Sequence, residues 1–85
     1  MPVVRAHLTS VLARYEAMLA YGQFEALDRE LFEETWQPTP GLLTSLEIET
    51  VGPLIVDFEL AVADRDDRRA RQALERARDW VRRRR

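Results

Sequence analysis

The sequence predicts an all-α fold, a small four-helix domain built from two helical hairpins. Apolar residues recur at steps of three and four in the N-terminal part of the chain, which is the spacing of one helix face. Glycine and proline interrupt this pattern at Gly22 and again in the QPTPG segment. A chain of 85 residues is the size of one domain. We therefore expect a single domain, 1–85, with a hairpin at 3–36, a loop at 37–41, a second half at 42–81 and an arginine tail at 82–85.

The first hairpin is expected to contain helices at 3–21 and 24–36, so that Trp36 ends the second of them. Gly22 separates the two helices, because glycine adopts the left-handed conformation that ends a helix at little cost. The apolar residues that define the two faces are Val4, Leu8, Val11, Leu12, Tyr15, Met18 and Leu19 in the first helix, and Phe24, Leu27, Leu31, Phe32 and Trp36 in the second.

Residues 42–63 are compatible with two structures. The runs LEIETV and LIVDFELAV alternate apolar with other residues, which is typical of strands, so an α+β domain with a central β-hairpin at 45–62 is the alternative. The turn of that hairpin would be Gly52–Pro53, which is not among the favoured two-residue hairpin turns. The same dipeptide suits a helix start, with Gly52 as the cap and Pro53 in the first turn. We favour the all-α fold.

A helical stripe of apolar residues supports this choice. It runs from Val56 to Val81 at alternating steps of four and three, and Asp67 is its only polar member. One helix over 53–83 would be about 46 Å long, which is long for so small a chain. An aspartate suits an N-cap at a helix break, so we expect two helices that meet near 64–66. The stripe comprises Val56, Leu60, Ala63, Asp67, Ala70, Leu74, Ala77 and Val81, and the predicted core comprises Leu8, Leu12, Tyr15, Leu27, Leu31, Phe58, Leu74 and Trp80.

An internal repeat also favours two hairpins. A shift of 43 residues aligns the halves as helix, tight turn and helix, pairing Ala17 with Leu60, Ala20 with Ala63, Leu27 with Ala70 and Leu31 with Leu74. The segment YGQFEALDRELFEETWQPTP resembles the turn and second helix of a tetratricopeptide repeat, with a glycine, an aromatic residue two positions on, an apolar residue three further and a proline after the helix. ADRDDRRARQALERAR resembles a degenerate copy. The resemblance implies a helical scaffold that binds proteins.

The charge of the chain is divided unevenly. Residues 1–63 carry three arginines against ten acids, a net charge of −7, whereas residues 64–85 carry ten arginines against five acids, a net charge of +5. Such an asymmetry indicates self-association or a charged partner. The sequence has no cysteine, no apolar run long enough to span a membrane and no signal-peptide core at its start. We therefore expect a cytoplasmic protein without membrane association.

No motif for catalysis, cofactor binding or metal binding is recognisable. His7 is the only histidine, so it lacks the partners of a catalytic triad or a histidine metal site and is expected at the boundary of the first helix. Asp64, Asp66 and Glu75 occupy positions one, three and twelve of a calcium-loop template, but Arg68 and Arg69 occupy positions five and six, where the loop needs a ligand and a glycine. A turn and a negatively charged helix start are the expected structure there. We expect no enzyme, no cofactor and no metal.

The arginine-rich C-terminus and the acidic second helix are the candidate partner-binding surfaces. Carboxylates are interleaved with the arginines at helical spacing, and the pI of about 5.4 disfavours a dedicated nucleic-acid binder. The predicted function is a small non-enzymatic protein–protein interaction or adaptor module that self-associates as a homo-oligomer. The alternative is a small nucleic-acid-binding regulator that uses the C-terminal arginines. The predicted partner-binding residues are Trp80, Arg78, Arg82, Arg83, Arg84 and Arg85, together with Glu30, Glu33 and Glu34.

Overall fold

The computed structural model describes residues 2–36 and 45–83, with side chains described for 5–36 and 49–83. These residues form α1 (Pro2–Ala20), α2 (Phe24–Phe32), α3 (Ser45–Ala63) and α4 (Asp67–Arg83), and no strand lies among them. The predicted all-α fold of two helical hairpins is therefore confirmed, and the β-hairpin alternative at 45–62 is wrong. The loop predicted at 37–41 lies outside the described residues.

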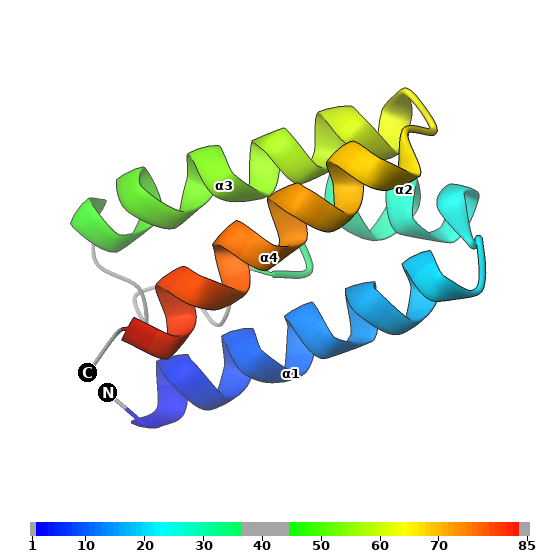
Figure 1. Ribbon diagram of the computed structural model, residues 1–85. Coiled ribbons are helices and arrows are strands. Elements are labelled where there is room, and N and C mark those ends of the chain that lie inside the picture. The colour runs from blue at the N-terminus through cyan, green and yellow to red at the C-terminus, as the bar shows by residue number, and fades with distance from the viewer. Residues whose placement is uncertain (1, 37–44, 84–85) are drawn as a thin grey trace.

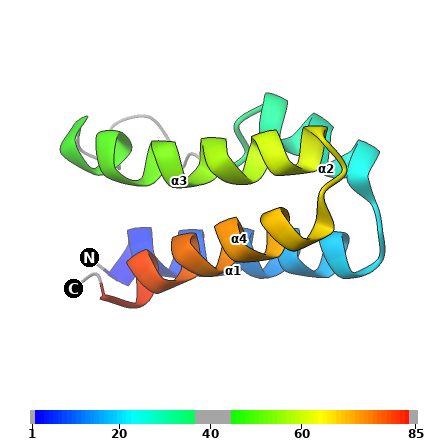
Figure 2. The ribbon, with the colours of Figure 1, turned by 45° about the horizontal axis from the view of Figure 1, so that its top comes forward.

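The four helices run alternately in opposite directions and form a helical bundle (Figure 1). Each helix packs against the next one along the chain, and α4 also packs against α1. Figure 2 shows the resulting layers, with α1 beside α4 in one and α2 with α3 in the other. Because α4 packs against α1 in its own layer and against α3 in the other, it joins the two layers. The start of α1 and the end of α4 lie at the same end of the molecule.

The core is filled by apolar side chains from all four helices. Tyr15 of α1 and Phe58 of α3 are fully buried, and their rings stack with centroids 5.9 Å apart and planes inclined by 18°. The hydroxyls of Tyr15 and Thr35 lie 2.6 Å apart, so the polar end of the buried tyrosine keeps a hydrogen bond. The predicted core members Leu8, Leu12, Tyr15, Leu27, Leu31, Phe58 and Leu74 are buried, whereas Trp80 is half-buried against the edge of the core.

The two hairpin turns have the same backbone structure. At the end of α1, Gly22 adopts a φ of 68° and the amide of Gln23 donates to the carbonyl of Met18 at 2.9 Å. At the end of α3, Arg65 adopts a φ of 55° and the amide of Asp66 donates to the carbonyl of Ala61 at 2.9 Å. Both are Schellman motifs. Gly22 and Arg65 are separated by the 43-residue shift that aligned the halves of the sequence, while the tetratricopeptide resemblance stays a prediction.

The break between α3 and α4 falls at the predicted position, 64–66, so the alternative of one helix over 53–83 is wrong. The cap is Asp66 rather than Asp67, because the Asp66 carboxylate accepts the amide hydrogen of Arg69 at 3.1 Å. Asp67 is the first residue of α4, where its negative charge faces the positive end of the helix dipole.

The second helix is shorter than predicted, since α2 ends at Phe32 instead of Trp36. Glu34 adopts a φ of 53° and the amide of Thr35 donates to the carbonyl of Glu30 at 3.1 Å, which is a third Schellman motif. No glycine marks this end, so the sequence pattern gave no stop signal. Beyond the turn, Trp36 folds back into the core and is only 6% exposed.

The predicted helix start at Gly52–Pro53 is also wrong, because α3 begins at Ser45 and Pro53 lies inside it. Proline removes the donor that would bond the carbonyl of Glu49, and the residue before a proline normally clashes in the helical conformation through its Cβ. Gly52 has no Cβ, which lets the helix continue through this dipeptide. Burial of Val51 and Ile55 on either side offsets the lost hydrogen bond.

The predicted apolar stripe does not face one core throughout. The apolar residues of its α4 half are buried, but Val56 and Leu60 are 48% and 52% exposed. The turn at 64–66 resets the helical phase, so a pattern that is continuous in sequence faces inward after the turn and outward before it. In α3 the buried positions are instead Val51, Ile55, Phe58, Ala61 and Val62.

Candidate interaction surface

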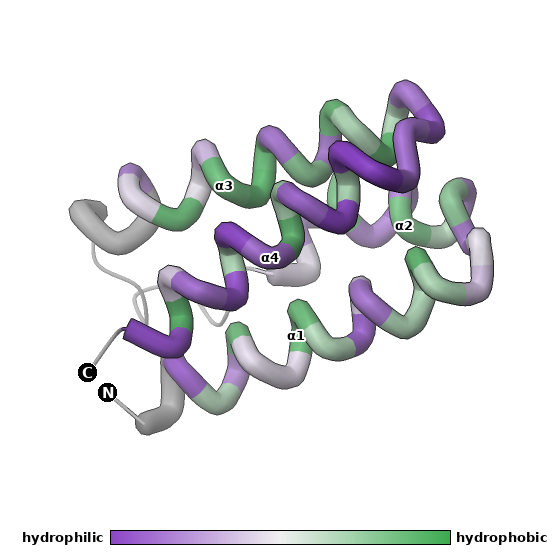
Figure 3. Tube along the Cα trace, viewed as in Figure 1, coloured by the Kyte–Doolittle hydropathy of each residue, from purple (hydrophilic) through white to green (hydrophobic). Residues whose placement is uncertain are grey.

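The outward side of α3 carries a second apolar face, which we name the α3 stripe: Pro53, Val56, Leu60 and Ala63. These residues follow one another at steps of three, four and three, and all are exposed. Figure 3 shows the contrast between α3, which is hydrophobic over most of its described length, and α4, which is mainly hydrophilic. An exposed face of this kind on a helix that already buries its opposite face is typical of an interaction surface.

The neighbouring helix α4 has the opposite charge from α3. Residues 45–63 contain four acids and no base, a net charge of −4, whereas residues 67–83 contain seven arginines and three acids, a net charge of +4. Some of these arginines are neutralised along α4, two of them by carboxylates at the predicted spacing of three or four residues. Arg71 lies 2.8 Å from Asp67, and Arg82 pairs with Asp79 and with Glu75. The hydrogen bond to Asp79 raises the pKa of the Arg82 guanidinium above its ordinary value.

A hollow of about 300 Å³ lies between α3 and α4 and is lined by Asp57, Arg69, Gln72, Ala73 and Arg76. Arg69 is held by Asp64 at 3.1 Å. Asp57 and Arg76 have no ion pair among the side chains that the structure describes. Two opposite charges are therefore available beside the α3 stripe.

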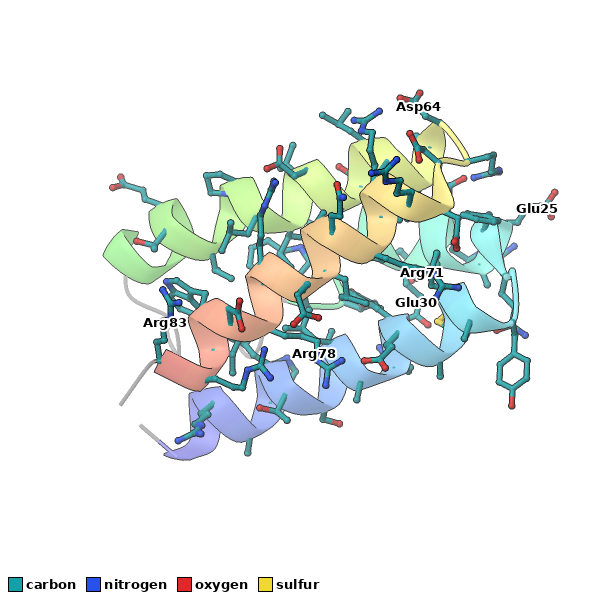
Figure 4. The ribbon with its side chains drawn as sticks, viewed as in Figure 1. Glu25, Glu30, Asp64, Arg71, Arg78 and Arg83 are labelled. Carbon is teal, nitrogen blue, oxygen red and sulfur yellow. The ribbon has the colours of Figure 1, made fainter. Side chains whose placement is uncertain are left out.

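A second cleft, of about 280 Å³, lies between α1 and α4, and its charges are already matched within the chain. Arg78 of α4 pairs with Glu16 of α1 across it. Figure 4 shows Arg71 and Arg78 extending from α4 along this side of the molecule. The Arg78–Glu16 pair joins two helices, while Arg71 and Glu75 each pair with another residue along α4, so the charged groups of this cleft are already engaged within the chain.

Arg65 joins the α3–α4 turn to α2 in a comparable way. Its guanidinium lies 2.6 Å from a carboxylate oxygen of Asp28, 2.9 Å from the carbonyl of Val62 and 5.5 Å from the centroid of the Phe24 ring. These contacts hold the left-handed turn against α2. They also occupy an arginine that the sequence alone would leave available for a partner.

No protein-family model, no curated protein and no solved structure matches this chain. The side chains of the described ranges hold no cluster of three histidine, cysteine or carboxylate groups suited to a metal ion. Within the same ranges, no helix combines the length and hydropathy needed to cross a membrane.

The predicted binding residues at the C-terminus serve mainly within the fold. Trp80 packs against the core, Arg78 pairs with Glu16, and Arg82 pairs along α4. The helix continues through Arg83, so the first half of the predicted arginine tail is helical. Arg83 is exposed and has no ion pair with any described residue. Arg84 and Arg85 lie outside the described residues.

The predicted acidic residues of the second helix do not form one uniform patch. Glu30 is half-buried, accepts a hydrogen bond from Arg14 at 2.6 Å and lies 3.2 Å from the Thr35 hydroxyl. Glu33 is exposed at the end of α2, and Glu34 is exposed in the turn that follows. Glu30 and Arg83 lie far apart in Figure 4, so one copy of the chain does not bring the two predicted charged surfaces together.

The remaining candidates have structural surroundings. His7 is half-buried on α1, and its Nε2 atom has no hydrogen-bond partner in the described part of the chain. Asp64 pairs with Arg69 and points outward from the α3–α4 turn (Figure 4), while Asp66 caps α4. The calcium-loop residues are thus engaged with arginine and backbone groups.

The sequence pattern included Val56, Leu60 and Ala63 of the α3 stripe, but it did not predict that this face is exposed. The predicted stripe placed Val56 and Leu60 on one face with Ala70, Leu74, Ala77 and Val81, which are buried, although Val56 and Leu60 are exposed. The signal was nevertheless present, because a second apolar series at helical spacing occupies the same segment: Val51, Ile55, Phe58 and Val62. A helix with apolar residues on two faces exceeds what one core can bury, which indicates a partner on the other face.

Proposed function

We propose that this chain is a small non-enzymatic protein–protein interaction or adaptor module that binds its partner through the α3 stripe. The observation that carries the proposal is the 48% and 52% exposure of Val56 and Leu60 on one face of a helix. Fully burying an aliphatic side chain contributes about 1.5–3 kcal/mol, and only about half of this gain is realised at either position within the chain. We expect the module to act in the cytoplasm.

The surroundings of the stripe support this proposal. Protein interfaces combine an apolar centre with a charged or polar rim. Here the aliphatic pair is flanked by Asp57 on α3 and by Arg76 on α4, neither of which has an ion pair among the described residues. The surface therefore offers both a region to desolvate and charges that select a partner.

The test compares the stripe with a more exposed apolar residue elsewhere. Leu60→Gln should abolish association with the partner, detected by chemical cross-linking in the native host followed by mass spectrometry. Phe32→Gln is the matched control, because Phe32 is 83% exposed on α2 and lies outside the stripe. Cross-links that survive Leu60→Gln unchanged would show that the interaction surface lies elsewhere.

Nucleic-acid binding is the second candidate, and one observation favours it. Arg68, Arg76 and Arg83 are exposed on α4 and have no ion pair with other described residues. Phosphate binding by such arginines weakens steeply as salt rises. A regulator of this class would bind a fluorescent oligonucleotide at low salt, and the Arg76→Gln variant would no longer bind it. The interaction module predicts no change in fluorescence anisotropy for either protein.

A further inference from the structure

The α3 stripe is complementary to itself in an antiparallel arrangement. Val56 and Leu60 are symmetric about position 58, and so are Pro53 and Ala63. If two copies of α3 lie antiparallel with their stripes in contact, the two-fold axis passes at the level of residue 58. Val56 of each copy then faces Leu60 of the other, and Pro53 faces Ala63. Isologous contacts of this kind are the commonest way in which identical chains assemble.

The size of the stripe requires that α4 also takes part. It spans eleven residues of helix, roughly 15 Å in length and about 10 Å in width. A stable interface buries about 800 Å² on each partner, several times the area of such a strip. The hollow between α3 and α4 is lined on the α3 side by Asp57, which follows Val56 of the stripe in sequence. The surface of α4 beside it must therefore contribute to any stable contact.

The charges beside the stripe fit a second copy. In an antiparallel helix pair the same flank of each helix meets across the two-fold axis, so the two α3–α4 hollows face each other. Each hollow contains Asp57 and Arg76, which have no ion pair within the described part of the chain. Residues 45–63 supply no base of their own, so an acidic and apolar α3 needs a partner that places arginine beside an apolar face. This chain itself has that surface.

We propose that the partner bound by the α3 stripe is a second copy of this chain. The two copies form a two-fold dimer with antiparallel α3 helices, in which Asp57 of each copy pairs with Arg76 of the other. This inference rests on the proposed function and names its partner. Opposite charges placed across an interface in this way fix the orientation of the partner and exclude other registers.

Charge reversal in analytical ultracentrifugation tests the pairing. Asp57→Arg places two arginines of one copy against two of the other, and Arg76→Asp does the same with acids. We expect each single variant to raise the dimer dissociation constant at least about tenfold. The double variant, Asp57→Arg with Arg76→Asp, restores opposite charges and should return the constant to within about threefold of the original, a coupling that separate effects on folding would not produce.

Glu25→Arg and Arg29→Asp are the matched controls, because both side chains are exposed on α2 and neither has an ion pair with a described residue. Figure 4 shows Glu25 pointing away from the bundle. Each control makes the same charge change as one test variant and should leave the dissociation constant unchanged. Far-UV circular dichroism of every variant establishes that the helices are retained.

Three outcomes contradict the proposed dimer or its antiparallel arrangement. A chain that stays monomeric at all concentrations, yet loses a host partner in Leu60→Gln, refutes self-association and leaves the proposed function standing. A monomer without any stripe-dependent partner refutes both. A dimer that is insensitive to Asp57→Arg and Arg76→Asp, or that the double variant does not restore, refutes the antiparallel α3 arrangement.

Discussion

Tyr15 is the side chain that connects most parts of the fold. Its ring stacks on Phe58, and its hydroxyl lies 2.6 Å from that of Thr35 in the turn after α2. Thr35 also donates to the carbonyl of Glu30 at 3.1 Å, so it keeps a partner when the tyrosine hydroxyl is removed. A residue at the junction of three segments should influence stability through both packing and hydrogen bonding.

We expect Tyr15→Phe to lower the free energy of unfolding by about 1 kcal/mol, because it removes one buried hydrogen bond and keeps the ring. Urea unfolding followed by circular dichroism measures this change. Tyr21→Phe is the control, since Tyr21 is 82% exposed, and surface substitutions of this kind stay within about 0.5 kcal/mol. Equal effects of the two variants would show that the Tyr15–Thr35 contact contributes nothing.

The same residue makes stability depend on alkaline pH. Burial raises the pKa of Tyr15 above its ordinary value of 10.0, because it disfavours the phenolate. The folded chain thus retains a proton that the unfolded chain releases. This contribution is complete below about pH 10 and is lost as the pH rises through the raised pKa. Urea unfolding across an alkaline series should show the free energy of unfolding falling less steeply in Tyr15→Phe than in the original chain; identical slopes would contradict the expectation.

At the scale of elements, α1, α2 and α3 are each followed by a residue in the left-handed backbone conformation, and the free energy that this conformation costs differs among the three residues. Gly22 adopts its φ of 68° without strain, whereas Glu34 and Arg65 adopt similar angles with a side chain. A left-handed residue other than glycine costs about 1–2 kcal/mol. Arg65 offsets this cost through its contacts with Asp28 and Phe24. The three turns therefore share one backbone geometry but contribute differently to the free energy of unfolding.

Two substitutions at these ends should have opposite effects. Gly22→Ala should lower the free energy of unfolding by about 1 kcal/mol, and the loss is conformational because a Cβ at Gly22 would meet nothing within 4 Å. Glu34→Gly should raise it by about 0.5–1 kcal/mol, because glycine removes the strain at φ 53°. Chemical denaturation of both variants provides the measurement, and changes of the same sign would refute the explanation.

The sequence was informative wherever an element carried its own local signal. Gly22 marked the end of α1, and the aspartates near 64–66 marked the break before α4. Prediction from the sequence failed where an element lacked a local signal or carried two competing ones. The end of α2 has no glycine, and α3 contains two apolar series, of which only the one with Phe58 faces the core. Which series turns inward depends on contacts with α2 and α4, and these long-range contacts are not encoded by local spacing.

At the scale of the whole molecule, the charge asymmetry of the sequence is partly used inside the chain. Arg78 pairs with Glu16 and Arg65 with Asp28, so two arginines of the basic segment join it to the acidic segment. Exposed pairs of this kind contribute only about 0–1 kcal/mol each, so they orient the helices more than they stabilise them. Burying the apolar surface that is still exposed, chiefly the α3 stripe, would add more to the free energy of unfolding than these ion pairs do.

Burial of the α3 stripe in a dimer should make the stability of the chain depend on protein concentration. A chain of this size buries only about 60% of its unfolded surface, so covering the α3 stripe adds appreciably to a small total. For a dimer that unfolds to monomers, a hundredfold rise in concentration adds about 2.7 kcal/mol per dimer. The thermal unfolding midpoint, followed by circular dichroism, should then rise by several degrees over that range in the original chain and in Phe32→Gln. In Leu60→Gln it should stay constant, because the stripe can no longer be buried. A midpoint independent of concentration in the original chain, or a dependence that persists in Leu60→Gln, would mean that the stability of the bundle does not draw on this face.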